Sequence, residues 1–437
     1  MKGYYRMRFF IEFESYNRDF YWRSVLASKL SKLGHEVILG HVSNLSNYVI
    51  SMKLQGVFFA KDCVPNRRVI FKELKDNKVV NIVLDEEGFV SSLQPEKFKY
   101  FRFNNDCTPY IDLVFVNSKY EKQLLLEIYP HLINKLVLCL SPRHTMFQNN
   151  NAYCKEAENI KRKFGNFIFI PLSMSNKHIV GSNKRKNQLK MMADYMKSSG
   201  GKVDLKLFID FYNKMLKNNL DLVKLIIKVA KIRKDLNFVV RPHPSESLSK
   251  FKESFLDLPS NVFIEIDFIV QPYIDESTAV VHSNCTSGID SFFLKKTTFN
   301  YTSNLSPSKK ISKIYGKEFS SIKDLEVELL KEDWESPSFD KLSSQLYRKE
   351  SELRFVISLL NTISLENVST WVFDKTIYKV FYYCLSNLKK VFRQDDILFN
   401  WFRIKSSDSS LSDTSVRLIH EGVIKLKKHP PINDHEE

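Results

Sequence analysis

Hydrophobic and polar residues along the first 140 positions follow two alternating periods. Short apolar runs, such as 79–84 (VVNIVL) and 112–117 (DLVFVN), are typical of strands buried on both faces. Between these runs, apolar residues recur at three- and four-residue spacing, as in 19–33, which is typical of amphipathic helices. The alternation predicts a parallel sheet covered by helices on both faces. The expected strands are 8–13, 36–40, 56–60, 79–84, 112–117 and 135–140, and the expected helices are 19–33, 67–77 and 119–128.

A second alternating series begins after a polar stretch. Residues 142–165 include three consecutive asparagines and few apolar anchors, so we expect a linker there. In the second series the expected strands are 166–172, 237–240, 262–266, 279–282 and 298–301, and the expected helices are 204–233 and 286–295.

From about residue 310 the pattern is helical and richer in charge, with helices expected over 325–334, 343–360 and the aromatic segment 372–392. The predicted fold class is therefore α/β, with two Rossmann-like doubly wound domains and a helical C-terminal extension. Two such domains place a ligand cleft between them, at the carboxyl ends of the strands. The expected boundaries are 1–145 for the N-terminal domain, 146–165 for the linker, 166–310 for the C-terminal domain and 311–437 for the extension.

Composition narrows the choice of partner. Hydrophobic residues make up 43% of the 437 positions and charged residues 27%, as in ordinary globular proteins. The formal net charge is +16, so we expect an anionic partner: a phosphate-bearing small molecule, an anionic membrane surface or nucleic acid. The basic residues are spread along helices, and no helix-turn-helix, RRM or KH signature occurs. We therefore expect no nucleic-acid partner, although nucleic-acid binding stays open as an alternative.

Cysteine spacing and hydropathy indicate the compartment. None of the six cysteines forms a CxxC pair, which fits reduced thiols in a cytosolic protein. No run reaches about 18 uncharged apolar residues, and Glu12 and Glu14 interrupt the N-terminal apolar stretch before a signal-peptide core can form. We expect a cytoplasmic protein that can rest on the inner face of the cytoplasmic membrane. The aromatic segment 372–392 suits packing on the body or contact with an anionic bilayer.

The segment FVVRPHPSES, residues 238–247, carries the first candidate site. An apolar strand ends there, and His243 lies between two prolines that restrict the backbone. Arg241 shares a face with His243 by strand alternation. An imidazole and a guanidinium together suit a phosphate, whereas the alternative is a strand-end turn with a structural histidine.

The segment AVVHSNCTSGIDSFF, residues 279–293, carries the second candidate site. A strand is followed by a hydroxyl-rich turn and a helix, whose first N–H groups can bind an anion. The alternative is a helix cap that binds nothing. The candidate phosphate-binding residues here are Ser283, Asn284, Thr286, Ser287 and Gly288.

The segment IVLDEEGF, residues 82–89, carries the third candidate site. A strand delivers Asp85, Glu86 and Glu87 to its carboxyl end, where a carboxylate can act as general base or nucleophile. A solvated acidic turn is the alternative. The sequence contains no Walker A motif, GxGxxG, HExxH or Asp-x-Asp. We therefore expect no metal and no cofactor, and a site built from an imidazole, hydroxyls and a helix N-terminus.

In the order of these motifs the chain resembles GT-B glycosyltransferases of bacterial surface-carbohydrate biosynthesis, related to the Kdo and sialic-acid transferases of capsule and lipopolysaccharide assembly. The likeness covers roughly residues 7–305 and rests on LDEEG at 84–88, a Pro-Arg segment at 141–143, RPHPSE at 241–246 and HSNCTSG at 282–288. The resemblance implies a CMP-sugar donor whose CMP moiety is held by His243 with Arg241 and by Ser283, Thr286 and Ser287. We expect the acceptor to be a lipid-linked glycan.

The resemblance also assigns the acids. EEGF at 86–89 is similar to the EDGF segment of capsule Kdo transferases, so Glu87 takes the place of the catalytic aspartate and Glu86 supports it, with Asp85 as a rival. Where the family has an aspartate after the Pro-Arg segment, this chain has His144. Two further alternatives stay open: a polyol-phosphate transferase that uses CDP-glycerol or CDP-ribitol, and an inactive relative that scaffolds an assembly complex.

Overall fold

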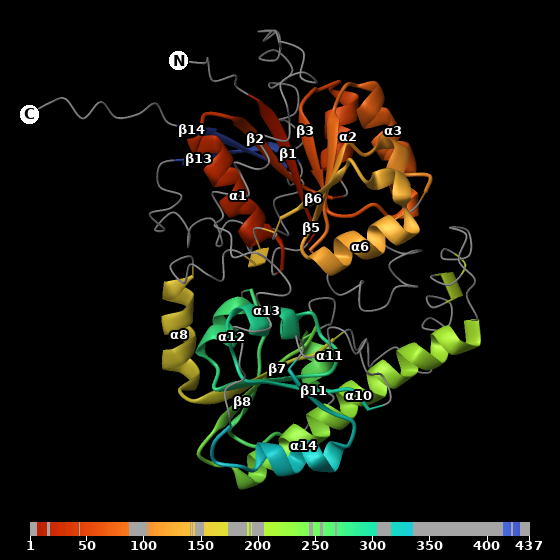
Figure 1. Cartoon of the computed structure of the whole chain (residues 1–437). Helices are drawn as coiled ribbons and strands as arrows, with labels where there is room; N and C mark the ends of the chain where they lie inside the picture. The colour runs from red at the N-terminus through yellow and green to blue at the C-terminus, as the bar shows by residue number, and fades with distance from the viewer. Residues whose placement is uncertain are drawn as a thin grey trace, which may run out of the picture.

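The computed structural model shows two β-sheets built mainly of parallel strands, one above the other in Figure 1, each covered by helices on both faces. The expected α/β fold of two doubly wound domains is confirmed. The structure describes residues 7–14, 18–42, 44–86, 103, 105–139, 141, 143–144, 153–173, 190–191, 194, 205–243, 248–253, 257–266, 269–303, 316–334, 414–420 and 423–428.

The N-terminal sheet has the strand order β13-β14-β2-β1-β3-β4-β5-β6. Its first six strands in sequence are parallel, and the order β2-β1-β3 reverses direction between β1 and β3. The strands are β1 (Arg8–Phe13), β2 (Glu36–His41), β3 (Val57–Ala60), β4 (Val80–Leu84), β5 (Leu113–Val116) and β6 (Leu136–Leu138).

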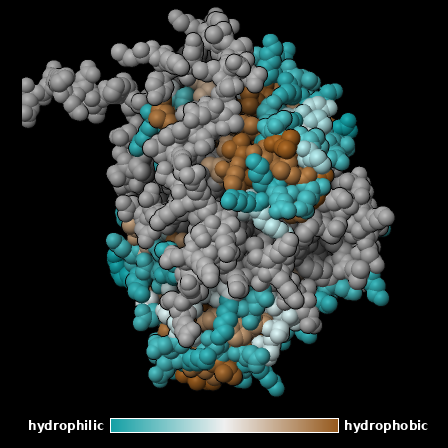
Figure 2. Space-filling model, in the orientation of Figure 1, coloured by the Kyte–Doolittle hydropathy of each residue, from teal (hydrophilic) through white to brown (hydrophobic). Residues whose placement is uncertain are grey.

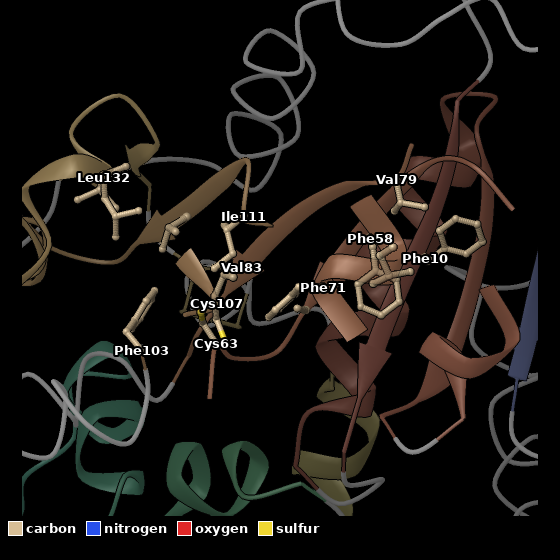
Figure 3. Packing of buried hydrophobic residues seen from close by; sticks show 14 of the residues in the cluster. Phe10, Phe58, Cys63, Phe71, Val79, Val83, Phe103, Cys107, Ile111 and Leu132 are labelled. Atoms are coloured by element: carbon tan, nitrogen blue, oxygen red, sulfur yellow. The ribbon is translucent and has the colours of Figure 1, made fainter. Parts of the chain in front are cut away.

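Apolar strand residues on both faces hold this sheet between helices. Helix α1 (Phe20–Lys32) packs on one face, with Phe9, Ile11 and Phe59 beneath it. On the other face, Phe10, Phe58 and Phe71 lie in one fully buried cluster, shown in Figure 3. The helices that cover this second face are α2 (Leu45–Ser51), α3 (Arg68–Asp76) and α6 (Lys119–Ile128), with 3₁₀ turns at Pro65–Arg67, Thr108–Tyr110 and Pro130–Leu132.

The chain's C-terminal region returns to the N-terminal sheet. Strands β13 (Thr414–His420) and β14 (Val423–Lys428) form an antiparallel hairpin, and β14 pairs antiparallel with β2. The sequence pattern predicts no strand here. Of the expected helices in the extension, 343–360 and 372–392 lie outside the described residues.

The C-terminal sheet has the order β12-β11-β10-β7-β8-β9, and all its strands are parallel. This is the classical dinucleotide-fold order 3-2-1-4-5-6, and its direction reverses between β7 and β10. The strands are β7 (Phe167–Pro171), β8 (Asn237–Arg241), β9 (Val262–Ile264), β10 (Ala279–His282), β11 (Thr298–Tyr301) and β12 (Lys317–Phe319).

Two groups of helices cover this sheet. One face carries α8 (Cys154–Phe164), α12 (Gln271–Glu276) and α13 (Ser287–Phe293). The other carries α10 (Leu205–Ile232), α11 (Leu248–Glu253) and α14 (Ile322–Leu329). The long α10 runs outward beyond the body of the domain (Figure 1).

Helix α8 occupies the segment whose polar composition predicts a linker. Its buried residues Ala157, Ile160 and Phe164 recur at helical spacing, but charged residues between them hide the pattern. Helix α14 begins earlier than the expected 325–334, because the Ser321 side chain accepts a hydrogen bond from the Asp324 amide and caps it there.

No helix in the described part of the chain combines the length and apolarity needed to cross a bilayer. Its surface in Figure 2 shows hydrophilic residues alongside separate hydrophobic areas on both domains.

Candidate functional site

The two reversal points of strand order define where a ligand is expected. In open α/β sheets, ligands bind outside the carboxyl ends of the strands at such points. In the C-terminal domain this position lies beyond Pro171 and His282, which end β7 and β10. In the N-terminal domain it lies beyond Phe13 and Ala60, which end β1 and β3.

The turn after β10 is held in a strained shape by side chains. Asn284 has a φ of +47°, a left-handed conformation that costs free energy in a residue other than glycine. Asn300 on β11 fixes it twice: its Oδ1 accepts from the Asn284 amide at 2.9 Å, and its Nδ2 donates to Asn284 Oδ1 at 3.2 Å. The Cys285 amide donates to Nδ1 of the buried His282 at 3.2 Å. The sequence analysis names Asn284 but not Asn300 or His282.

The start of α13 differs from the expected hydroxyl cap. Thr286 precedes the helix in a helical conformation and makes no side-chain cap hydrogen bond, because a capping side chain needs an extended backbone. Ser283 and Ser287 are buried, and Ser287 Oγ accepts from Cys285 Sγ at 3.5 Å. The Gly288 amide donates to the Cys285 carbonyl. Ser283, Asn284 and Thr286 therefore lie in the turn, and Ser287 and Gly288 begin α13.

Arg241 and His243 lie at the end of β8, on the other side of β7 from this turn. Arg241 is buried, and its guanidinium lies 5.8 Å from the centre of the Tyr273 ring. His243 is half-buried, and residues 244–247 lie outside the described residues. The two candidate segments thus flank the end of β7 rather than occupy adjacent strands.

The acidic segment follows β4. Asp85 and Glu86 are buried, and Glu87 lies outside the described residues. Glu86 Oε1 accepts from Arg23 Nη2 at 2.8 Å. Burial raises the pKa of the Glu86 carboxyl, and Arg23 opposes that rise. Glu86 is therefore engaged by a buried arginine of α1, which the sequence pattern does not single out.

Arg143 joins the two domains. Its Nε donates to Asp290 Oδ1 at 3.2 Å and its Nη2 to Asp290 Oδ2 at 2.6 Å, while its Nη1 lies 3.9 Å from Glu86 Oε2. Asp290 belongs to α13, and Gln271 Nε2 also donates to it at 3.4 Å. Burial raises the pKa of the Asp290 carboxyl, and Arg143 opposes that rise. The acidic segment and the hydroxyl-rich turn therefore face one junction.

Asn117, which follows β5, aligns the segments on the N-terminal side of this junction. Its Nδ2 donates to the Asp85 carbonyl at 3.2 Å, and its Oδ1 accepts from the Ser141 amide at 3.0 Å. His144 is buried and stacks on Phe293 of α13, with ring centres 4.6 Å apart. Burial lowers the pKa of His144, and Arg143 lowers it further. The Pro-Arg segment thus contacts both domains.

A second charged cluster lies at the reversal point of the N-terminal sheet. Glu12, fully buried at the end of β1, accepts from Arg67 Nη1 at 2.8 Å and from the Lys61 amide at 3.1 Å. Arg67 Nε lies 2.6 Å from Asp62 Oδ1, and Lys61 pairs with Glu14. These contacts fix the ends of β1 and β3 relative to each other. Within the described ranges, no three His, Cys, Asp or Glu side chains gather as a metal ion would require.

A small cavity of about 10 Å³ lies at the domain junction. That volume is enough for roughly one water molecule. Its lining comes from both domains and consists of Arg18, Tyr21, Trp22, Arg143, Tyr153, Ile269 and Gln271.

No protein-family model and no curated protein sequence matches the chain. Among solved structures, the UDP-GlcNAc 2-epimerase of Methanocaldococcus jannaschii, in complex with UDP-GlcNAc and UDP, is 12% identical with a TM-score of 0.50, over 81% of this chain and 100% of that one. A Listeria monocytogenes structure named for the same epimerase activity is 8% identical with a TM-score of 0.51, over 85% of this chain and 100% of that one. The wall teichoic acid polymerase TagF is 12% identical with a TM-score of 0.49, over 81% of this chain and 88% of that one. The likeness to the two epimerase structures establishes the two-domain GT-B-like fold and nothing finer.

Proposed function

We propose that the protein is a metal-independent glycosyltransferase of surface polysaccharide biosynthesis. It transfers a 2-keto sugar acid, Kdo or a related sugar, from a CMP-activated donor to a glycan acceptor. The observation that carries this proposal is the Arg143 bridge, because it links Glu86, next to the proposed catalytic acid, to Asp290 on the helix that follows the hydroxyl-rich turn.

In this proposal the C-terminal domain holds the nucleotide. The CMP phosphate lies beyond the ends of β7 and β10, where the hydroxyls of the strained turn and the His243 imidazole can donate hydrogen bonds to it. Asn284, held left-handed by Asn300, keeps the turn in a single shape, so its donors need no rearrangement when the phosphate leaves.

The N-terminal domain supplies the carboxylate. Glu86 is buried and paired with Arg23, which favours a supporting role and leaves Glu87 as the proposed general base or nucleophile. As base, its carboxylate would take the proton of the acceptor hydroxyl while that oxygen attacks the anomeric carbon and the CMP phosphate leaves with the bonding electrons. As nucleophile, it would first form a glycosyl ester with the same loss of CMP.

The nucleotide class is tested by calorimetric titration of CMP, CDP, UDP and UDP-GlcNAc into the full chain. We expect CMP to bind best, and His243→Ala to weaken it at least tenfold. Turnover is then tested with CMP-Kdo, CMP-sialic acid and CDP-glycerol. Release of CMP from a CMP-sugar, abolished by Glu87→Gln with CMP affinity retained, supports the proposal. Binding of uridine nucleotides alone, or turnover of CDP-glycerol alone, rejects it.

A further inference from the structure

Unpartnered polar atoms concentrate at the domain junction. Trp22 Nε1, Arg23 Nε and Nη1, Ser141 Oγ and Tyr153 Oη are all buried and have no hydrogen-bond partner in the described structure. Buried polar atoms normally have partners, so a cluster of exceptions calls for an explanation. Both Trp22 and Tyr153 line the small cavity at the junction.

These atoms share one chemical character. Indole and guanidinium N–H groups can only donate hydrogen bonds, and hydroxyls can donate as well as accept. Burial raises the pKa of Tyr153, and the carboxylates of Asp275 and Asp290 raise it further, so its hydroxyl keeps its proton at neutral pH. A molecule that satisfies this cluster must therefore present acceptors.

The remaining lining of the cavity suits an anionic sugar. Arg143 and Arg18 line it, paired with Asp290 and Glu14 respectively, and the rings of Tyr21, Trp22 and Tyr153 offer apolar surface to a sugar's C–H groups. Two buried acids at the junction are already paired: Glu86 with Arg23, and Asp290 with Arg143. An ionised carboxyl group, which only accepts hydrogen bonds, matches the donors left over.

We infer that this junction is a binding site for the carboxylate of a sugar acid, with Trp22 and Tyr153, which both line the cavity, as hydrogen-bond donors. The inference rests on the proposed function and assigns the recognition of its substrate class to particular residues. The cavity of about 10 Å³ is too small for a sugar ring. The sugar must therefore enter when the domains move apart, and that movement breaks the Arg143–Asp290 contact.

The carboxylate could belong to the donor sugar or to a sugar acid in the acceptor. Calorimetry on the full chain separates these sources. If the donor sugar occupies the site, CMP-N-acetylneuraminate or CMP-Kdo binds at least tenfold more tightly than CMP. If the acceptor does, free N-acetylneuraminate or Kdo binds to the CMP-saturated protein, and the methyl ester of N-acetylneuraminate, which lacks the charge, does not.

Tyr153→Phe tests the site without removing packing. It takes away only an unpartnered hydroxyl, so the unliganded protein should fold as before. We expect it to reduce binding of the sugar acid about tenfold or more, the value of a hydrogen bond to a charged group, and to leave CMP affinity unchanged. Tyr110→Phe is the matched control, because Tyr110 packs in the cluster on the other face of the N-terminal sheet and should change neither affinity.

The inference is overturned if CMP binds but no sugar acid adds affinity in either arm. It is also overturned if Tyr153→Phe binds sugar acids as the wild type does, in which case the cavity holds only water. If CMP fails to bind while a free sugar acid binds and depends on Tyr153, the proposed function fails and the junction site stands.

Discussion

Replacing Arg143 by alanine leaves Asp290 buried without its guanidinium partner. The Asp290 side chain is fully buried, and Gln271 at 3.4 Å is then its closest remaining donor among the described contacts. Removing one partner of a buried ion pair typically costs about 3–5 kcal/mol, because the other charge stays uncompensated. Protonation of the carboxyl limits this cost. At pH 7, about 3 pH units above the ordinary aspartate pKa, taking up a proton costs about 4 kcal/mol.

The stability difference between Arg143→Ala and the wild type should depend on pH. Burial already raises the pKa of Asp290 above its unfolded value, so its contribution lowers stability as pH rises. Loss of Arg143 raises that pKa further, and the variant therefore loses stability more steeply with pH than the wild type. At pH 5 protonation costs only about 1.5 kcal/mol, so the difference between variant and wild type narrows there.

Thermal unfolding at pH 5 and pH 7 measures this effect. At pH 7, a loss of about 3–4 kcal/mol corresponds to a fall in Tm of roughly 6–16 °C for a domain of this size. Adding Asp290→Asn to Arg143→Ala removes the stranded charge and should restore most of the loss. If Arg143→Ala melts within about 2 °C of the wild type at both pH values, Asp290 is not held as a buried ionised partner, and the reasoning fails.

Three further predictions concern the strand ends. Glu12→Gln should destabilise the N-terminal domain by about 1.5–3 kcal/mol in denaturant unfolding, because buried Arg67 loses a charged hydrogen-bond partner and keeps Asp62 as its remaining carboxylate. Asn284→Gly should lose about 1–2 kcal/mol in stability, because glycine accepts the φ of +47° but leaves buried Asn300 Nδ2 without its acceptor. Asn284→Val should lose about 1–3 kcal/mol more than the glycine variant and weaken CMP binding further in calorimetry, because a β-branched residue also strains that backbone.

The sequence predicts most of the fold because the strands are locally encoded. Runs such as 36–40 and 279–282 match β2 and β10 to within one residue, since both faces of these strands are buried and the apolar run is unbroken. The β13–β14 hairpin was not predicted, although Val416 and Leu418, and Ile424 and Leu426, flank Gly422 in two short runs typical of a hairpin. Its attachment to β2, nearly 400 positions earlier in the chain, cannot be read from local sequence.

The sequence singles out the segments around Glu86, His243 and Ser283 because each follows a recognisable strand, and their functional roles stay predictions. Arg23 and Asn300 were not singled out, because their roles come from partners at distant positions, 63 residues away for Arg23 and Glu86. A signal existed in both cases: Arg23 lies among apolar residues at the start of α1, and Asn300 lies between Phe299 and Tyr301 in a fully buried strand.

The composition of the domain junction bears on how the two halves can work together. Apolar contacts do cross it, since Ile269 joins the core cluster of the N-terminal domain and Tyr120 packs against that of the other. At its centre, however, are ion pairs, whose Coulomb attraction is largely offset by the desolvation of the charges. Such a junction fixes the position of one domain relative to the other but adds little net free energy to their association. The bidentate hydrogen bonds between Arg143 and Asp290 specify one arrangement of the two domains. A ligand that offers acceptors to the Arg143 guanidinium can replace this contact at small net cost in free energy. A purely apolar junction of the same area would hold the domains together more strongly and would contain no hydrogen-bond donors for the proposed anionic sugar.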